Sequence, residues 1–169
     1  MKIILTTEVH KTLREIVFDT RVETGACLFG TKTDIGEFKV LHLAGPGKNA
    51  KHTACHYEGD NDHYEEVYNA LLKTVPDLKH IGEFHVHPAG MNQLSFGDRR
   101  TIKKVLKTYE EFVAGVILRE LDWIDPCDRT PWLKGSTGRL LPLKWVMNIY
   151  PVYFSRTKPK GEELELVIE

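Results

Sequence analysis

One stretch of this sequence decides how the chain is interpreted: Lys79-His80-Ile81-Gly82-Glu83-Phe84-His85-Val86-His87-Pro88. Its composition predicts a β-strand that ends at Pro88, because proline has no N–H to donate to a neighbouring strand. Residues two apart on a strand point to the same face, so His85 and His87 can reach a single cation. The stretch therefore predicts a strand that carries two metal ligands.

A second element follows shortly after Pro88. Ser95-Phe96-Gly97-Asp98 has the pattern of a helix start, with Ser95 as N-cap and Asp98 three residues later. A turn between strand and helix can bring Asp98 back beside the two histidines as a third ligand. Two imidazoles and one carboxylate leave a fourth position open for water, which is typical of catalytic rather than structural zinc sites.

A simpler interpretation of each part has to be weighed. Ser95 and Asp98 alone are best explained as an ordinary capping box, and the two histidines can be strand residues whose ring nitrogens are satisfied by the protein. Two histidines on one strand face, followed by a correctly spaced carboxylate, favour the metal site. The absence of cysteine from this cluster disfavours softer metals, but ligand type alone does not separate zinc from iron or manganese.

The combined pattern is more specific than either element. The chain has His-x-His-Pro, then a spacer of six residues, then Ser-x-x-Asp, and upstream the segment Glu23-Thr-Gly-Ala-Cys-Leu-Phe-Gly30. This combination resembles the motif of the JAMM (MPN+, JAB-domain) zinc metalloproteases, most closely their prokaryotic branch. The resemblance runs from about Ile3 to Phe154. Val86 stands where many members have Ser or Thr, and Ala26 where a second Gly is common, and neither position supplies a ligand.

The resemblance implies a role for each matched residue. His85, His87 and Asp98 would hold one Zn²⁺ ion, Glu23 would be the general acid/base, and Ser95 would support the tetrahedral oxyanion. From local sequence alone Glu23 is an ordinary solvated loop residue, and only its match to the motif gives it a catalytic role.

Glu83 is a competing carboxylate. It lies two residues before His85, on the same strand face, where it can support a metal ligand or act as a rival base.

The resemblance also implies a substrate. It would be a ubiquitin-like or sulfur-carrier protein with an extended C-terminal tail, cut at the peptide or isopeptide bond after its last glycine. Two alternatives stay open: a non-catalytic MPN-type interaction module, and a zinc amidohydrolase that acts on a small amide.

Length and composition set outer limits. With 169 residues, 41% of them hydrophobic, we expect one domain over residues 1–169. The net charge of −1 gives no basic footprint for nucleic acid or an anionic membrane. Cys27, Cys55 and Cys127 are scattered and odd in number, which favours free thiols in a reducing, cytoplasmic compartment. No signal peptide or membrane-spanning segment is expected.

Hydrophobic periodicity predicts a mixed α/β (α+β) fold, with a central mixed sheet flanked by about three helices, as the JAMM resemblance also implies. The expected helices cover 7–18, a second helix with an apolar stripe from Tyr64 to Val75, and 96–109. The expected strands cover 26–30, 37–43, 79–87, 112–118 and 145–154, and, on a weaker pattern, 163–168.

Two further segments carry open interpretations. Residues 119–142 form an irregular insertion whose Trp123 and Trp132 either face the substrate or pack on the domain, and residues 155–169 form a C-terminal tail. A second set of ligand types has spacing that suits a solvated loop better than a second zinc site. It comprises His52, Cys55, His56 and His63.

Overall fold

The computed structural model describes residues 1–33, 35–123, 132–134 and 140–169, without the side chains of 121–144. The side chains of Trp123 and Trp132 and the whole of Cys127 lie outside the described residues, and with them the predictions that concern these three residues.

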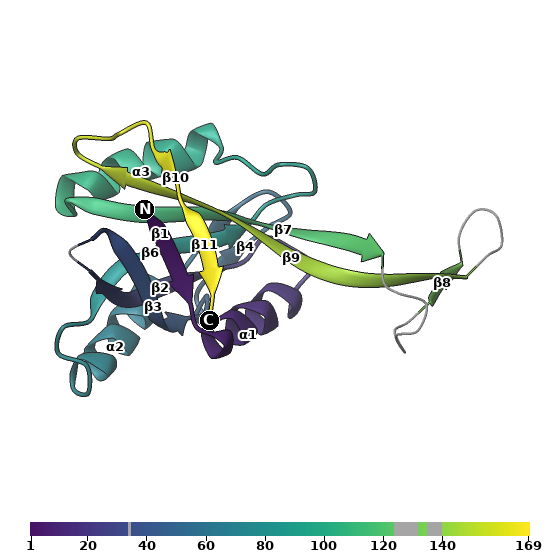
Figure 1. Cartoon of the computed structure of the whole chain (residues 1–169), viewed down its shortest axis with the longest axis horizontal. Helices are drawn as coiled ribbons and strands as arrows, with labels where there is room; N and C mark the ends of the chain where they lie inside the picture. Colours follow the sequence, from purple (N-terminus) through teal and green to yellow (C-terminus); the bar gives the residue numbers. More distant parts are fainter. Residues whose placement is uncertain (34, 124–131, 135–139) are drawn as a thin grey trace.

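Most strands belong to one mixed sheet, in the order β10-β9-β7-β6-β2-β3-β1-β11, with β8 paired to β9. In Figure 1, β7 and β9 run together as a long ribbon. The strands of this sheet are β1 (Lys2–Leu5), β2 (Gly25–Lys32), β3 (Glu37–Ala44), β6 (Lys79–Val86), β7 (Glu111–Trp123), β8 (Trp132–Lys134), β9 (Leu140–Ser155), β10 (Glu162–Glu163) and β11 (Glu165–Ile168). A separate hairpin pairs β4 (Lys51–His52) with β5 (Tyr57–Glu58).

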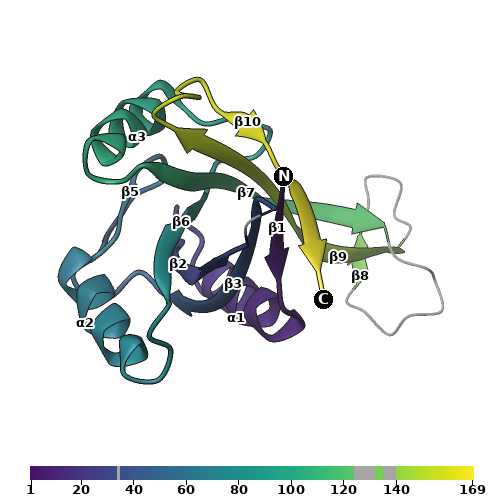
Figure 2. The ribbon, with the colours of Figure 1, turned by 60° about the vertical axis from the view of Figure 1, so that its left-hand side comes forward.

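The two ends of this sheet meet. β10 pairs with β9 at one end, β11 pairs in parallel with β1 at the other, and only Leu164 separates β10 from β11 in sequence. The buried Leu164 donates its backbone N–H to the carbonyl of Pro151 in β9. The sheet therefore curls into a nearly closed barrel, and Figure 2 shows its strands following one another around the body.

This architecture corrects the expected fold class. The described residues have the expected mixed α/β content and three helices. The expected JAMM/MPN-like arrangement, a central sheet flanked by these helices, is wrong, because the molecule is strand-rich and dominated by the curled sheet. Closure depends on β1, β10 and β11, which are two to four residues long. Segments this short contain too little of a period-2 pattern to reveal that the sheet closes on itself.

Helix α1 (Thr7–Phe18) packs on the inner face of the sheet. Thr6 caps it by accepting a hydrogen bond from the N–H of Val9. Its buried stripe of Val9, Leu13 and Val17 joins the largest core cluster, which includes side chains of β1, β2, β3, β6 and β7.

Helices α2 (Asn61–Leu72) and α3 (Phe96–Thr108) lie outside the curl (Figure 2). Side chains of β2 alternate between the two faces: Ala26 and Leu28 belong to the inner cluster, whereas Cys27 and Phe29 pack beneath α2. Helix α3 covers β7 in a third cluster. The outer surface between α2 and α3 is where β6 presents its polar side chains. No helix in the described ranges is both long and apolar enough to cross a bilayer.

Candidate metal centre

The two histidines of the opening stretch converge at the end of β6. The Nε2 atoms of His85 and His87 are 2.8 Å apart, and their ring centroids are 4.6 Å apart. The backbone N–H of His87 donates to the carbonyl of Ile117 in β7, so strand pairing still fixes the chain at that residue. The expected common face for the two imidazoles is present.

Helix α3 brings Asp98 to the same point. The capping box is formed: Asp98 N–H donates to Ser95 Oγ at 3.2 Å, and Ser95 N–H donates to Asp98 Oδ2 at 2.6 Å. The carboxylate oxygens also lie 3.4 Å from His85 Nε2 and 3.2 Å from His87 Nε2. His85, His87 and Asp98 therefore form a group that could hold a metal ion, and their ligand atoms lie within 4.8 Å of one another.

The spacing of these atoms is compatible with one tetrahedral metal ion. Tetrahedral ligands bound at about 2.0–2.1 Å stand about 3.3 Å apart. The two imidazole–carboxylate separations, 3.4 and 3.2 Å, match that value, and the two imidazole nitrogens need to separate by only about 0.5 Å to reach it.

The ring of His87 is oriented by its other nitrogen. Nδ1 of His87 lies 3.1 Å from the carbonyl oxygen of Met91, which can only accept a hydrogen bond. In the neutral ring the proton must then be on Nδ1, which leaves the lone pair of Nε2 directed at the centre of the cluster. Such a support is what a histidine ligand needs.

The charges of the cluster are strongly coupled. Burial opposes ionisation of Asp98, but hydrogen bonds from His85, His87 and Ser95 hold the pKa of its carboxyl group far below the usual range. Burial likewise opposes the charged form of His87, yet Asp98 raises the pKa of this imidazole. The carboxylate thus favours a positive charge between the rings, which protons or a metal cation can supply.

Strand register places Glu23 beside this cluster. Gly25 of β2 pairs with His85 of β6 in an antiparallel register, and Val86 N–H donates to the carbonyl of Thr24 at 2.7 Å. One residue further back, Glu23 lies next to His87. The two segments are far apart in sequence, and the β2–β6 pairing unites them.

Glu23 is buried, with 8% of its surface exposed. Burial raises the pKa of its carboxyl group, and the nearby His87 and His85 oppose the rise only in part. Its backbone is held from both sides: Glu23 N–H donates to the carbonyl of Thr53, and Nδ1 of His52 lies 2.9 Å from the carbonyl oxygen of Glu23. His52 was a residue of the doubtful second ligand set, and the structure shows it supporting Glu23 instead.

The predicted site residues share one cleft of about 720 Å³. It runs between α2 and α3 over the outer face of β6. All five line it: Glu23, His85, His87, Ser95 and Asp98.

A further group was not anticipated from the sequence. Potential ligand atoms of Cys27, His80 and Glu83 lie within 4.8 Å of one another. Burial raises the pKa of the Glu83 carboxyl, and Nε2 of His80 is buried without a hydrogen-bond partner. Glu83 also lines the cleft, so its role as a rival to Glu23 remains a hypothesis.

The other sequence predictions on ligands have clear positions. Within the described ranges, His52, Cys55, His56 and His63 do not gather into a group that could hold a metal. Cys27 and Cys55 are free thiols.

Comparison with known proteins adds a likeness of fold alone. No family model matches the chain, and no curated protein does. The chain is similar to a structure determined in solution, that of a structural genomics target from Desulfitobacterium hafniense. The TM-score is 0.63 and the identity 15%, over 99% of this chain and 92% of the other.

Proposed function

We propose that this chain is a zinc-dependent peptidase whose site residues act as those of the JAMM motif that they resemble. Its substrate is a ubiquitin-like or sulfur-carrier protein, cut at the peptide or isopeptide bond after the C-terminal tail. The observation that carries the proposal is the meeting of a His-His-Asp group with a buried carboxylate, Glu23, in one cleft.

The division of labour follows from the positions of the side chains. Zinc held by His85, His87 and Asp98 would lower the pKa of water and polarise the carbonyl under attack. Glu23 accepts the proton of the attacking water and delivers it to the nitrogen of the leaving amine. Burial raises the pKa of its carboxyl group above the usual range, which favours a group that must take a proton and then give it back.

Ser95 is placed to help with the developing negative charge. Its Oγ accepts the N–H of Asp98, and its hydroxyl hydrogen, which can bond to the Asp98 carboxylate, can turn to a substrate oxygen instead. A donor directed at the substrate carbonyl oxygen stabilises the transition state more than the ground state.

The cleft also has an edge on which an extended tail can lie. Its lining includes Tyr57 and Glu58 of β5, and β5 pairs only with β4 among the described residues. A peptide that adds beside β5 would gain backbone hydrogen bonds without a requirement for particular side chains. This arrangement favours a flexible protein tail over a small amide.

A panel of fusions tests the proposal. Ubiquitin-like and sulfur-carrier proteins, each joined after the terminal glycine to a reporter by a linear or an isopeptide bond, are incubated with the zinc-loaded protein and with Glu23→Gln as a matched control. We expect cleavage after the glycine of at least one fusion, and none by Glu23→Gln.

Each other result points to a named alternative. Zinc binding without cleavage of any fusion, but with turnover of small N-acyl amides, would identify the amidohydrolase. A protein that binds no zinc and binds the fusions uncut would be the non-catalytic module.

A further inference from the structure

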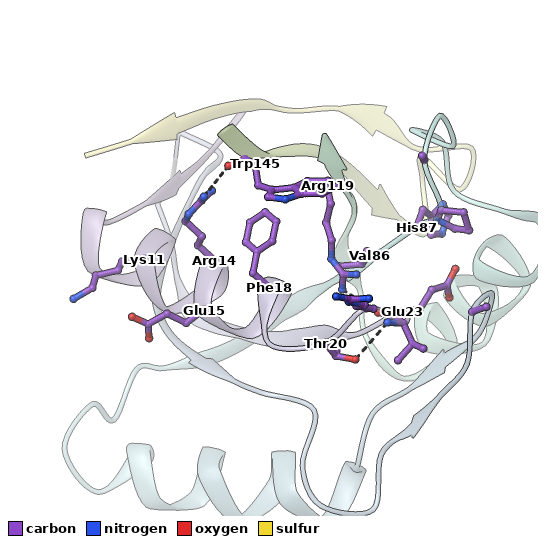
Figure 3. Close-up of a pocket in the computed structure, with 15 residues that line it drawn as sticks. Lys11, Arg14, Glu15, Phe18, Thr20, Glu23, Val86, His87, Arg119 and Trp145 are labelled. Atoms are coloured by element: carbon purple, nitrogen blue, oxygen red, sulfur yellow. Dashed lines mark hydrogen bonds between the residues drawn. The ribbon is translucent and has the colours of Figure 1, made fainter. Parts of the chain in front are cut away.

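A second cleft opens on the other side of Glu23. It has a volume of about 1060 Å³ and lies between α1, the segment after α1, β7 and β9 at Trp145 (Figure 3). Glu23, His87 and Pro88 line both clefts. The proposed acid/base group therefore stands at the boundary between them.

The second cleft is rich in cations. Four basic side chains face two acidic ones, and one of the two acidic groups, Glu23, is already assigned to proton transfer. The basic residues are Lys11, Arg14, Arg21 and Arg119; the acidic ones are Glu15 and Glu23.

Arg14 is already engaged at the far end of this cleft. Its Nη2 donates to the carbonyl of Trp145 at 2.7 Å, and its guanidinium lies 4.6 Å from the ring centroid of Phe18. Together these residues form one wall (Figure 3).

Arg119 is different, because no carboxylate among the described residues pairs with its charge. It extends from β7 toward Glu23 (Figure 3), and its Nη2 donates to the carbonyl of Val22 at 2.9 Å. Its Nε is buried without any hydrogen-bond partner, and burial lowers the pKa of the guanidinium while no carboxylate in the described part of the chain counters the effect. A partly buried guanidinium with an unused donor is costly unless an anion completes it.

We infer that this cleft binds a carboxylate carried by the residue whose amine leaves, and that Arg119 is its main partner. The inference rests on the proposed function. The carbonyl of Val22 accepts a hydrogen bond from Arg119, and Val22 directly precedes Glu23 in the chain. The guanidinium is therefore held one residue away from Glu23, the group that protonates the leaving nitrogen. With the acyl tail in the cleft of Ser95 and Asp98, the leaving residue must extend past Glu23 into the cleft of Arg119.

The carboxylate can come from two places on that residue. It is either the α-carboxylate of a terminal amino acid or the acidic side chain of a longer leaving group. Both offer the planar pair of oxygens that an arginine fork binds, and the choice defines the substrate.

Binding can be tested without metal or turnover. N-acetylalanine and N-acetylalaninamide are titrated into the zinc-free protein, and the arginine Nε–Hε signals are followed by NMR, with Arg119 assigned from its loss in Arg119→Met. We expect the Arg119 signal to shift with the acid and not with the amide. No shift at millimolar acid, or an equal shift with the amide, would overturn the inference.

Turnover then separates the two sources. Three peptides carry the same glycine-ended tail joined to alanine acid, alanine amide or aspartate amide. If Arg119 binds the α-carboxylate, the alanine-acid peptide should have a kcat/KM roughly tenfold or more above that of the alanine-amide peptide, as expected for a charge-assisted hydrogen bond. If Arg119 binds an acidic side chain, the aspartate-amide peptide should have the highest kcat/KM of the three. Arg119→Met should bring the favoured ratio to about one, Arg119→Lys should restore part of it, and Lys73→Met, outside both clefts, should keep it.

Failure of this inference and failure of the proposed function look different. If the NMR signal of Arg119 shifts with N-acetylalanine but the protein hydrolyses none of the peptides, the carboxylate site is supported and the proposed peptidase activity is wrong. If the protein hydrolyses all three peptides equally and its Arg119 signal does not shift, the peptidase activity is supported and the carboxylate site is wrong.

Discussion

Asp98 belongs to a helix and to the metal centre at the same time. One of its oxygens accepts the N–H of Ser95 and also faces His87, and the other faces His85. The capping box that offered the simpler explanation of this residue is therefore real, and it also fixes the carboxylate for a second task. A short polar side chain in the first turn is rigid enough to serve as both cap and ligand.

Glu23→Gln tests the proton-transfer role. The amide keeps the size of the side chain but cannot accept a proton, so zinc content and thermal stability should stay near wild type while kcat falls on the order of 10²–10⁴-fold. Glu83→Gln, made beside it, should lose much less activity. If the larger loss appears in Glu83→Gln, the acid/base role moves to Glu83.

Ser95 distinguishes a cap from a catalyst. If it only caps α3, Ser95→Ala should lower the free energy of unfolding by about 0.5–2 kcal/mol, and Ser95→Asp should restore stability with activity intact. We expect kcat to fall roughly 10²-fold in both zinc-loaded variants, because neither side chain donates a hydrogen bond to the oxyanion. Full activity of Ser95→Asp would leave Ser95 as a helix cap.

The sequence could reveal only part of this site. His85, His87 and Asp98 lie close together in the chain, so spacing alone predicted a common ligand set, which the structure brings together. Glu23 was found through a resemblance, since its approach depends on β2–β6 register. His52 and Arg119 reach Glu23 and Val22 across long sequence distances, and no local pattern signals such contacts.

At the scale of elements, the pairing of β6 with β7 holds the histidines in place. Gly82 lies opposite Val113, and a Cβ at position 82 would stand 1.8 Å from the Val113 carbonyl oxygen. Only a glycine permits this approach, because the obstacle is backbone and cannot rotate away.

Gly82→Ala should therefore destabilise the protein by about 2 kcal/mol or more, as for overpacking of a buried site, and should weaken zinc binding by shifting His85. Urea denaturation and a zinc competition titration measure the two effects. Gly45→Ala is the matched control, because its Cβ would lie 3.5 Å from Ile16, an ordinary contact. Equal stability of both variants would show that β6 and β7 can separate at no cost.

The elements differ in how far the sequence reveals them. Helix α1 was predicted with the bounds that the structure has, Thr7–Phe18, because its cap and apolar stripe agree. The hairpin of β4 and β5 was interpreted as a solvated loop, since two-residue strands have no periodicity. The closure of the sheet was missed because β10 and β11 pair with β9 and β1, strands far from each other in the sequence, which no local pattern reveals.

For the whole molecule, a rise in pH should lower the stability of the zinc-free protein and increase the stability that zinc adds. In the zinc-free protein, Asp98 raises the pKa of His87, so their attraction is fully present below about pH 6.5 and is lost as pH rises through the raised value. The lowered pKa of Asp98 means that its own contribution disappears only in strong acid. Zinc, in contrast, competes with protons for the imidazoles and binds better as pH rises.

We therefore expect the free energy of unfolding of the zinc-free protein to fall as pH rises above about 6.5, and the added stability from zinc to grow over the same interval. Thermal or urea unfolding at each pH, with and without zinc, measures both. Asp98→Asn should flatten the zinc-free profile. A zinc-free wild type whose stability rises over this interval would contradict the coupling of His87 with Asp98.

The central claim is that His85, His87 and Asp98 hold one zinc ion. Elemental analysis of the dialysed protein measures it directly, on the wild type, on His85→Ala, His87→Ala and Asp98→Ala, and on Cys27→Ala as a control for the neighbouring group. We expect about one zinc per chain in the wild type and in Cys27→Ala, and a large loss in each ligand variant. A full equivalent of zinc in any two of the ligand variants, or its loss in Cys27→Ala, would contradict the account.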